Sequence, residues 1–252
     1  MNEKQTENLR FKLLNVSSKQ KMDITHKGYE ATLVILSGEC KVTVQGSKKI
    51  LRRKNVFEEK ATALYIPSGM PFVIEAQVDS ELGLCLGRSE KQEGLAFFIE
   101  KDSVHCRTVG KEKFERVVCD IVDQRIAAEH LVVGETFNGP GQWSSFPPHK
   151  HDTDNLPQEA KMEEIYFFKV DPPEGFGFQR LYSPELGEDN AIVIMNNSVV
   201  PIRDGYHPVC VMPGCRLYYL WFLWGENRTL APFEDPELRA IDYDMSYPSA
   251  KK

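Results

Sequence analysis

The sequence predicts an all-β fold built from two similar halves, and two observations carry this prediction. Short runs rich in Val, Ile, Leu, Phe and Tyr are separated by Gly, Pro, Asn and Asp, whereas long stretches with a helical period are scarce. The pattern of strands and turns also occurs twice along the 252 residues. Short strands with turn signals about every 8–12 residues are typical of sandwiches and small barrels. We therefore expect two jelly-roll barrels in tandem.

The first half of the chain is expected to form strands joined by short turns. Gly38 and Glu39 join the first two strands, and Gly46 with Ser47 turns the chain into the third. The expected strands are 30–37, 40–45, 48–52, 63–67, 72–76 and 82–86. Residues 104–110 are expected to be a connector between the halves.

The second half continues in the same way. The expected strands are 115–121, 130–137, 165–170, 176–182, 191–195, 209–212 and 217–223. Only two short helices are expected, at 122–130 and 235–241.

An internal repeat indicates where the chain divides. Residues 28–76 parallel residues 162–212, because each copy has strands, a turn that begins with Pro and contains Gly, and a return strand. Two copies of a jelly-roll explain 252 residues better than one oversized domain. We therefore predict an N-terminal domain of residues 1–108 and a C-terminal domain of residues 109–252.

Composition excludes several classes of partner. The chain has 31 Lys and Arg against 37 Asp and Glu, a formal charge of −6, so we expect no nucleic acid, whose binding needs clustered cations. The longest apolar run, 217–224, is far shorter than the ~20 residues that span a bilayer, so we expect no membrane partner. Residues 1–12 are polar and charged, which predicts no signal peptide and a cytoplasmic protein.

The cysteines are expected to be reduced. The six cysteines form no C-x-x-C pair, and without a secretory signal they are expected to be buried as small apolar residues. A disulfide between Cys210 and Cys215, which flank a Met-Pro-Gly turn, is the alternative.

Three of the six histidines lie in the second half at positions that suit a metal site. His149-Lys150-His151 is a strand-like H-x-H, and the two-residue period of a strand puts both imidazoles on one face. Glu164 opens a later strand, and His207 follows a Pro-to-Gly turn. Three imidazoles and a carboxylate suit Zn, and also Mn, Fe, Co or Ni, with positions left open for substrate. We therefore predict that these residues bind a divalent metal, with Zn as the first choice.

Each of these features alone has an ordinary structural explanation. An H-x-H arises by chance, paired glutamates usually lie at a solvated strand edge, and a His beside Pro is usually a turn residue. Their order is far more specific: H-x-H, then Glu and four apolar residues, then a Pro-to-Gly turn, His and a strand. This order is the two-part motif of the cupin superfamily. We therefore expect two tandem cupin barrels, a bicupin.

Alternation and comparison between the halves refine the predicted site. Glu164 rather than Glu163 is the expected ligand, because it directly precedes the apolar strand and Glu163 faces the opposite side. Residues 152–163 form a long polar connection for a cupin, which we expect to be a loop at the pocket rim. The first half has neither an H-x-H nor a histidine at its own turn, 67–72. It is therefore predicted to be a degenerate cupin domain without metal.

Four segments carry a resemblance to a known family. They are 141–152 (GQWSSFPPHKHD), 163–166 (EEIY), 175–180 (GFGFQR) and 204–209 (DGYHPV). Together they resemble the 5-deoxy-glucuronate isomerases of bacterial myo-inositol catabolism, bicupins related to 5-keto-4-deoxyuronate isomerase. The likeness is strongest over 130–225, with Gln142 where the family usually has Asn, and Trp221 in an unusually aromatic stretch.

The resemblance implies conversion of 5-deoxy-D-glucuronate, a sugar acid, to 5-dehydro-2-deoxy-D-gluconate. This aldose–ketose isomerisation moves a proton from C2 to C1. Tyr166 shares the strand face of Glu164, Gln179 is polar among apolar neighbours, and Tyr219 is the more inward of a Tyr pair. We predict Tyr166, Gln179 and Tyr219 as catalytic candidates, although each also has an explanation as a core residue. Alternation leaves only Arg203 to meet the substrate carboxylate, and the general base stays open.

Two other functions fit the same ligand set. One is a cupin dioxygenase that binds Fe and O₂, and the other is a sugar-binding cupin without catalysis. Exposed edges of a jelly-roll also make a homo-oligomer an option.

Overall fold

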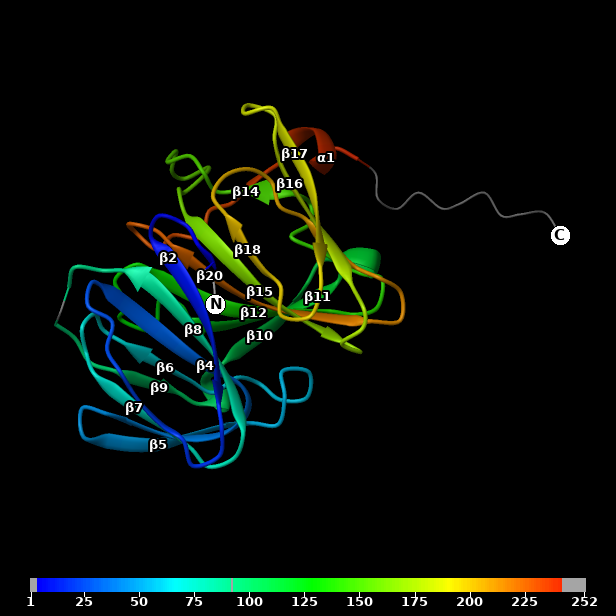
Figure 1. The fold of residues 1–252 in the computed structure, drawn as a ribbon. Helices are drawn as coiled ribbons and strands as arrows, with labels where there is room; N and C mark the ends of the chain where they lie inside the picture. Colours follow the sequence, from blue (N-terminus) through cyan, green and yellow to red (C-terminus); the bar gives the residue numbers. More distant parts are fainter. Residues whose placement is uncertain (1–3, 92, 242–252) are drawn as a thin grey trace.

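The structure is a computed structural model that describes residues 4–91 and 93–241. Most of its regular elements are β-strands, which form two groups that follow each other along the chain. In Figure 1 the blue and cyan strands of the first half lie beside the green to orange strands of the second half. The predicted all-β fold is confirmed.

The first half is organised around one long strand, β4. Its strands are β1 (Lys4–Gln5), β2 (Leu9–Val16), β3 (Lys21–Ile24), β4 (Tyr29–Val44), β5 (Ser47–Arg53), β6 (Ala63–Ile66), β7 (Phe72–Ala76), β8 (Ser80–Arg88) and β9 (Phe97–Ile99). The main order is β1-β2-β8-β4-β6-β9, while β5 and β7 pair with the later part of β4, and β3 pairs with β7. Strand β4 thus belongs to both layers of this half.

The prediction of two separate strands at 30–37 and 40–45 is wrong, because β4 runs through both. The pairing with β8 shifts between Ile35 and Ser37, and Gly38 adopts a φ of +97°. A Cβ at Gly38 would collide with the Asp79 carbonyl and with Ser80. Glycine therefore lets the strand bend here, and pairing continues on the other side of the bend.

The second half forms two facing sheets and a small β-pair. Its elements are η1 (Lys101–Ser103), β10 (His105–Val109), η2 (Glu112–Phe114), β11 (Arg116–Val122), β12 (Leu131–Asn138), β13 (Trp143–Ser144), β14 (His149–Lys150), β15 (Glu163–Asp171), β16 (Gly177–Ser183), β17 (Glu188–Ile194), β18 (Val199–Ile202), β19 (Val209–Val211), β20 (Arg216–Trp224), β21 (Phe233–Glu234) and α1 (Pro236–Arg239). The six-stranded sheet has the order β10-β11-β12-β20-β15-β18, and the four-stranded sheet has the order β13-β19-β16-β17. Strands β14 and β21 form the small pair.

The helix expected near the C-terminus is present as α1, within the predicted range 235–241. Asp235 caps it by accepting hydrogen bonds from the backbone N–H groups of Glu237 and Leu238. None of the helices in the described part of the chain is long and apolar enough to cross a membrane.

The helix predicted at 122–130 is wrong, because distant side chains take its backbone groups. Glu30 accepts hydrogen bonds from the N–H groups of Glu129, His130 and Leu131. The Arg228 guanidinium donates to carbonyl oxygens of the same segment, those of Asp123, Ile126, Ala128 and Leu131. These contacts join residues 97 to 105 positions apart in the chain, so local propensity could not predict them.

The two halves share a core. Phe11 of β2 stacks on Phe167 of β15 with ring centroids 4.8 Å apart. Nearby, Arg53 and Glu135 form a fully buried ion pair whose Nη1–Oε1 and Nη2–Oε2 distances are 2.5 and 3.1 Å. Tyr218 donates its hydroxyl to the same carboxylate at 2.7 Å. The charges are thus paired and hydrogen-bonded where the halves meet.

Two expectations about residues 104–119 need correction. Residues 105–109 form β10 rather than a connector, and β10 pairs with β11. In that pairing Cys106 lies opposite Cys119, and the two form a disulfide. The expectation that all cysteines are reduced is therefore wrong, while Cys210 and Cys215 are free thiols. The predicted boundary between 108 and 109 falls inside β10, and the division into two domains stays a prediction.

Candidate active site

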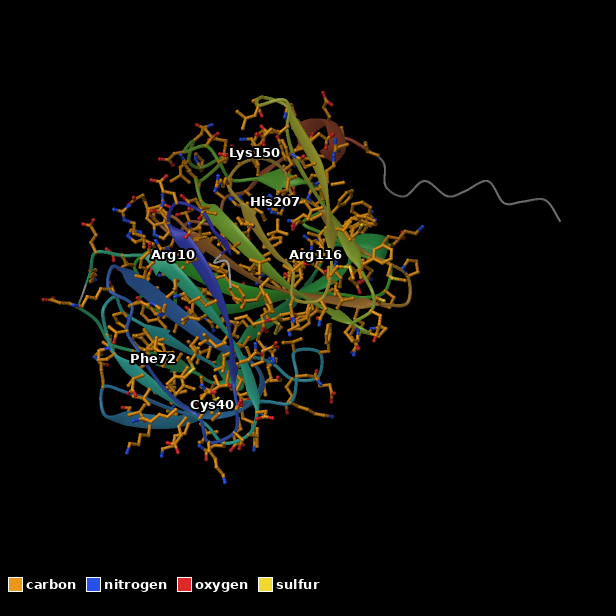
Figure 2. All side chains as sticks on the ribbon, viewed as in Figure 1. Arg10, Cys40, Phe72, Arg116, Lys150 and His207 are labelled. Carbon is orange, nitrogen blue, oxygen red and sulfur yellow. A yellow bond between two sulfur atoms is a disulfide. The ribbon has the colours of Figure 1, made fainter. Side chains whose placement is uncertain are left out.

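A cavity of about 330 Å³ opens within the second half. The inward residues of β11, β12, β20 and β15 form one wall, because alternate side chains of a strand share a face. Its lining comprises Arg107, Val109, Arg116, Val118, Thr136, Ser145, His149, His151, Met162, Glu164, Tyr166, Tyr219, Trp221, Leu223, Leu230, Ala231 and Pro232. In Figure 2, Arg116, Lys150 and His207 mark this half of the molecule.

Three of the four predicted metal ligands converge on one point. Ligand atoms of His151, Glu164 and His207 all lie within 4.8 Å of one another, and all three side chains are buried. Glu164 Oε2 lies 3.1 Å from His151 Nε2 and 3.4 Å from His207 Nε2. Among residues 4–91 and 93–241, this is the group of His, Cys, Asp and Glu side chains arranged closely enough to hold a metal ion.

Backbone carbonyls orient two of these imidazoles. His151 Nδ1 lies 2.7 Å from the Met162 oxygen, and His207 Nδ1 lies 3.0 Å from the Gly205 oxygen. A hydrogen bond from Nδ1–H to a carbonyl fixes the tautomer in which Nε2 carries the free lone pair. Both Nε2 atoms therefore present their lone pairs toward the point where the three side chains meet, as metal ligands do.

His149, the fourth predicted ligand, lies beside this group. Its ring centroid is 4.8 Å from that of His207 and 6.4 Å from that of His151. His149 belongs to β14, which pairs with β21, and His151 follows directly after the strand. The structure therefore brings all four predicted residues together: His149, His151 and Glu164 line the cavity, and His207 is fully buried beside them.

Burial governs the protonation of this cluster. It lowers the pKa of His149 to about 3, with His151 and then Arg116 adding to the effect. It also lowers the pKa of His207 well below the usual value, again helped by neighbouring imidazoles, and raises that of Glu164. For His151 burial opposes protonation, but the Glu164 carboxylate outweighs it and raises the pKa.

The donor set fits a divalent metal. His207 Nε2 is fully buried and makes no hydrogen bond within the described residues, although a carboxylate oxygen lies close to it. A buried imidazole nitrogen without a partner is costly unless something else binds its lone pair. Neutral imidazoles and a carboxylate are the ligand types that Zn and related metals prefer.

Alternation along β15 separates the two neighbouring glutamates as predicted. Glu164 points to His151, whereas Glu163 accepts hydrogen bonds from the backbone N–H and the side-chain amide of Asn8, at 2.9 and 2.8 Å. Glu163 also accepts a hydrogen bond from the Thr6 hydroxyl. One glutamate therefore belongs to the site and the other to the contact with the first half.

Tyr166 and Tyr219 both line the cavity, with ring centroids 4.6 Å apart. The Tyr166 hydroxyl lies 3.1 Å from Ser145 Oγ, and its ring is 5.9 Å from that of His207. Burial raises the pKa of both tyrosines, and at Tyr166 the Glu164 charge adds to the effect. Both phenols are therefore held in the protonated form, as hydrogen-bond donors.

Gln179 and Arg203 lie elsewhere. Gln179 is fully buried on β16 but does not line the cavity; its Nε2 donates to the His207 carbonyl at 3.4 Å. It therefore supports the segment that carries His207. Arg203 is exposed and is not part of the cavity lining. The cation for a substrate carboxylate must be sought at another position.

Three lining residues were missed by sequence reasoning or only partly anticipated. Arg116 reaches the cavity from β11, and Ser145 lies beside Tyr166. Trp221 lies over Gly134 of β12, where any Cβ would collide with the indole, and its Nε1 donates to Thr136 at 3.0 Å. Gly134 could have indicated this contact from the sequence, because a glycine inside an apolar strand often marks a place where another group approaches the backbone closely.

The connection from 152 to 162 meets the cavity at its last residue, Met162, whereas Asp154 and Lys161 line a different cavity. That the whole connection forms the rim of the site stays a prediction. Glu159 accepts hydrogen bonds from the N–H groups of Asp152 and Thr153 and from Lys150 Nζ, at 2.8, 2.9 and 3.0 Å. Lys150 is thus directed away from the histidines and holds the start of the connection in place.

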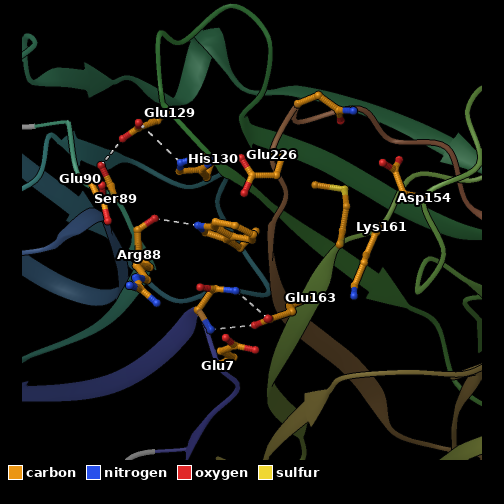
Figure 3. Close-up of a pocket in the computed structure, with 14 residues that line it drawn as sticks. Glu7, Arg88, Ser89, Glu90, Glu129, His130, Asp154, Lys161, Glu163 and Glu226 are labelled. Carbon is orange, nitrogen blue, oxygen red and sulfur yellow. Dashed lines mark hydrogen bonds and ion pairs between the residues drawn. The ribbon is translucent and has the colours of Figure 1, made fainter.

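A larger cavity of about 640 Å³ lies where the two halves meet, and it has a different character. Figure 3 shows its many carboxylates, among them Glu90, Glu129 and Glu226, with His130 and Arg88 between them. It contains none of the converging ligands, and an anionic sugar acid would be repelled by its carboxylates. We therefore place the site in the smaller cavity.

The comparisons with known proteins agree with this geometry. A family model described as the KduI/IolB family matches residues 1–241. A 5-deoxy-glucuronate isomerase of Geobacillus kaustophilus is 37% identical over 84% of this chain and 77% of its own length. One of Bacillus subtilis strain 168 is 37% identical over 90% of this chain and 84% of its own length.

Solved structures extend the likeness. An IolB-like protein of Salmonella typhimurium LT2 is 28% identical, with a TM-score of 0.88 over 93% of this chain and 91% of that one. Oxalate decarboxylase of Bacillus subtilis is only 12% identical, with a TM-score of 0.62 over 91% of this chain and 71% of that one. The second likeness concerns the fold alone.

Proposed function

The chain belongs to the KduI/IolB family, and on this basis we propose that it is a 5-deoxy-glucuronate isomerase. The proposed reaction converts 5-deoxy-D-glucuronate to 5-dehydro-2-deoxy-D-gluconate. The observation that carries the proposal is the convergence of His151, Glu164 and His207, two of which line the cavity, in a chain 37% identical to proteins with that name. His149 completes the proposed ligand set.

The chemistry requires that a proton leave C2 and arrive at C1 while the oxygens of an enediol are stabilised. A divalent metal held by the three histidines and Glu164 would supply a Lewis acid for the carbonyl oxygen and the neighbouring hydroxyl. Zn is our first choice, with Mn, Fe, Co and Ni as alternatives.

The chain's own residues provide the rest of the environment. Tyr166 and Tyr219 keep their phenolic protons and can donate hydrogen bonds to substrate oxygens, with Ser145 orienting the Tyr166 hydroxyl. Trp221, Leu223 and other apolar residues of the lining exclude water from the reacting carbons. Gln179 acts through the His207 carbonyl rather than on the substrate.

The remaining expectations are proposals of the same kind. We place the reaction in myo-inositol catabolism and the protein in the cytoplasm, with residues 1–108 as a domain without metal. The expected homo-oligomer stays a prediction, which size-exclusion chromatography with light scattering would test.

The direct experiment is to incubate the metal-loaded protein with 5-deoxy-D-glucuronate in D₂O without oxygen and to follow the sugar by NMR. The proposal predicts loss of the anomeric signals, appearance of the ketose, and a reaction that stops when the metal is chelated. Oxygen-dependent turnover would favour the dioxygenase alternative. Binding without conversion would favour a sugar-binding protein.

A further inference from the structure

Arg116 is a cation inside the proposed active-site cavity, and no carboxylate in the described ranges pairs with it. Its Nη1 donates to the carbonyl oxygens of Phe114 and Phe146 at 3.2 and 3.1 Å. These two contacts use one end of the guanidinium. They also fix the side chain in place, while the other N–H groups remain for a further acceptor.

The surroundings of Arg116 favour an anion. Burial lowers the pKa of its guanidinium, and only the phenols of Tyr219 and Tyr166 act in the opposite direction. Among the described residues, Glu164 is the one carboxylate in the lining of the cavity, and it faces His151. A carboxylate binds a half-buried positive charge of this kind more strongly than it binds an exposed positive charge, because water screens the half-buried charge less.

The other nearby cations are already engaged or lie outside the cavity. Arg107 lines the cavity, but it is largely exposed and pairs with Asp120. Lys150 is held by Asp152 and Glu159, and it is not part of the lining.

Two further arginines of the second half are also unsuitable. Arg180 is on the outer face of β16, where it pairs with Asp189 at 2.7 Å. Arg203 is exposed and outside the lining. Of these cations, Arg116 is thus the one that lies in the cavity without an acidic partner among the described residues.

We propose that Arg116 binds the terminal carboxylate of the substrate and so selects sugar acids over neutral sugars. The inference rests on the proposed isomerase function and assigns the two ends of the substrate. The carbonyl end of the substrate lies at His151, Glu164 and His207, and its carboxylate lies at Arg116. A planar guanidinium suits this role because it can donate two parallel hydrogen bonds to a carboxylate.

The test compares Arg116→Gln, Arg116→Lys and Arg116→Met with the matched control Arg180→Met. Gln retains donors without charge, Lys retains charge without the fork, and Arg180 is an arginine of the same half that lies outside the cavity and pairs with Asp189. For 5-deoxy-D-glucuronate we expect KM to rise about 10–100-fold in Arg116→Gln and Arg116→Met, the size of a lost charge-assisted hydrogen bond. Lys should recover part of the loss, and Arg180→Met should change KM less than about 3-fold.

A neutral probe separates carboxylate binding from a general disturbance of the site. Calorimetry on the metal-loaded proteins would measure the affinities for D-glucuronate and for its uncharged amide, glucuronamide. The wild type should prefer the acid, and Arg116→Gln should lose that preference while its metal content and melting temperature stay unchanged. Equal losses for both probes, or a wild type with no preference for the acid, would overturn the inference.

The two proposals fail in different ways. If the wild type does not isomerise 5-deoxy-D-glucuronate, the proposed function is wrong. The preference for D-glucuronate over glucuronamide, and its dependence on Arg116, would still decide whether this residue binds carboxylates.

Discussion

The two halves of the molecule use one kind of strand frame for different purposes. In the first half the inward residues of β4, β6, β7 and β8, such as Leu33, Leu64 and Ile74, pack into a closed apolar core. In the second half the corresponding space is an open cavity with buried imidazoles at one end. A barrel filled by side chains is a stable structure, whereas one that keeps buried histidines needs a ligand to satisfy them.

The difference lies in a few residues at equivalent turns. The turn of the first half reads Pro-Ser-Gly-Met-Pro over 67–71, and that of the second reads Gly-Tyr-His-Pro over 205–208. His207 and the H-x-H of β14 thus have no counterparts in the first half. A site can therefore be gained or lost at a few turn residues while the strand frame is kept.

The largest expected effect is the loss of the metal when His207 is replaced. His207→Ala should remove bound metal and reduce kcat/KM by more than the roughly 10–100-fold that loss of a partner behind a metal ligand costs. Elemental analysis and steady-state kinetics measure both effects. Met70→Ala, in the equivalent turn of the first half, is the control and should change neither. Full metal content in His207→Ala would show that the ligand assignment is wrong.

The next effect concerns the contact that joins the halves. Arg53→Met leaves the Glu135 carboxylate buried without its partner, so the free energy of unfolding should fall by about 3–5 kcal/mol. Urea denaturation measures this change. The double variant Arg53→Met with Glu135→Leu should recover much of the loss, because both charges are then removed. An unchanged midpoint in Arg53→Met would mean that the pair does not hold the halves together.

A smaller effect is expected from the Cys106–Cys119 disulfide, which crosses the β10–β11 pair of the second half. Cys106→Ser should lower the free energy of unfolding by about 2–4 kcal/mol. Thiol titration of the denatured, unreduced protein should find the four free cysteines, and titration after reduction should find six. Six reactive thiols before reduction would exclude the disulfide. Cys85→Ser, at a buried free thiol of the first half, is the comparison.

The smallest expected effect is on the phenols. Tyr166→Phe removes a hydrogen-bond donor from the cavity and should lower kcat about 10-fold, with metal content unchanged. Tyr65→Phe is the matched control, because the Tyr65 hydroxyl donates to buried Glu30 in the first half at 2.6 Å. That variant should lose stability but keep its kcat. An equal fall of kcat in both variants would remove Tyr166 from the catalytic environment.

The features that could be predicted from the sequence are those set by local periodicity. The H-x-H spacing and the alternation of Glu163 and Glu164 depend only on the two-residue period of a strand. Many strands of both halves were predictable for the same reason, because turn residues separate them, but β2, β3 and β18 were not expected. Local rules of this kind located His149 and His207 as well, since each lies at a turn or strand with a recognisable pattern.

The features that could not be predicted depend on contacts between distant residues. Arg116 faces the cavity because β11 pairs with β12 and β12 pairs with β20. A single sequence does not reveal this strand order or its register. The segment 123–130 is irregular because Glu30 and Arg228 take its backbone groups. The disulfide follows from the register of β10 on β11. The sequence of β10 predicts a connector, so this pairing could not be expected.

The central claim is that the second half binds a metal ion and the first half does not. Anomalous X-ray diffraction from crystals grown with Zn, collected on either side of the zinc absorption edge, tests it most directly. We expect one strong anomalous peak per chain, between His151, Glu164 and His207. A chain without a peak at those three residues, or with a peak inside the first half, would contradict it.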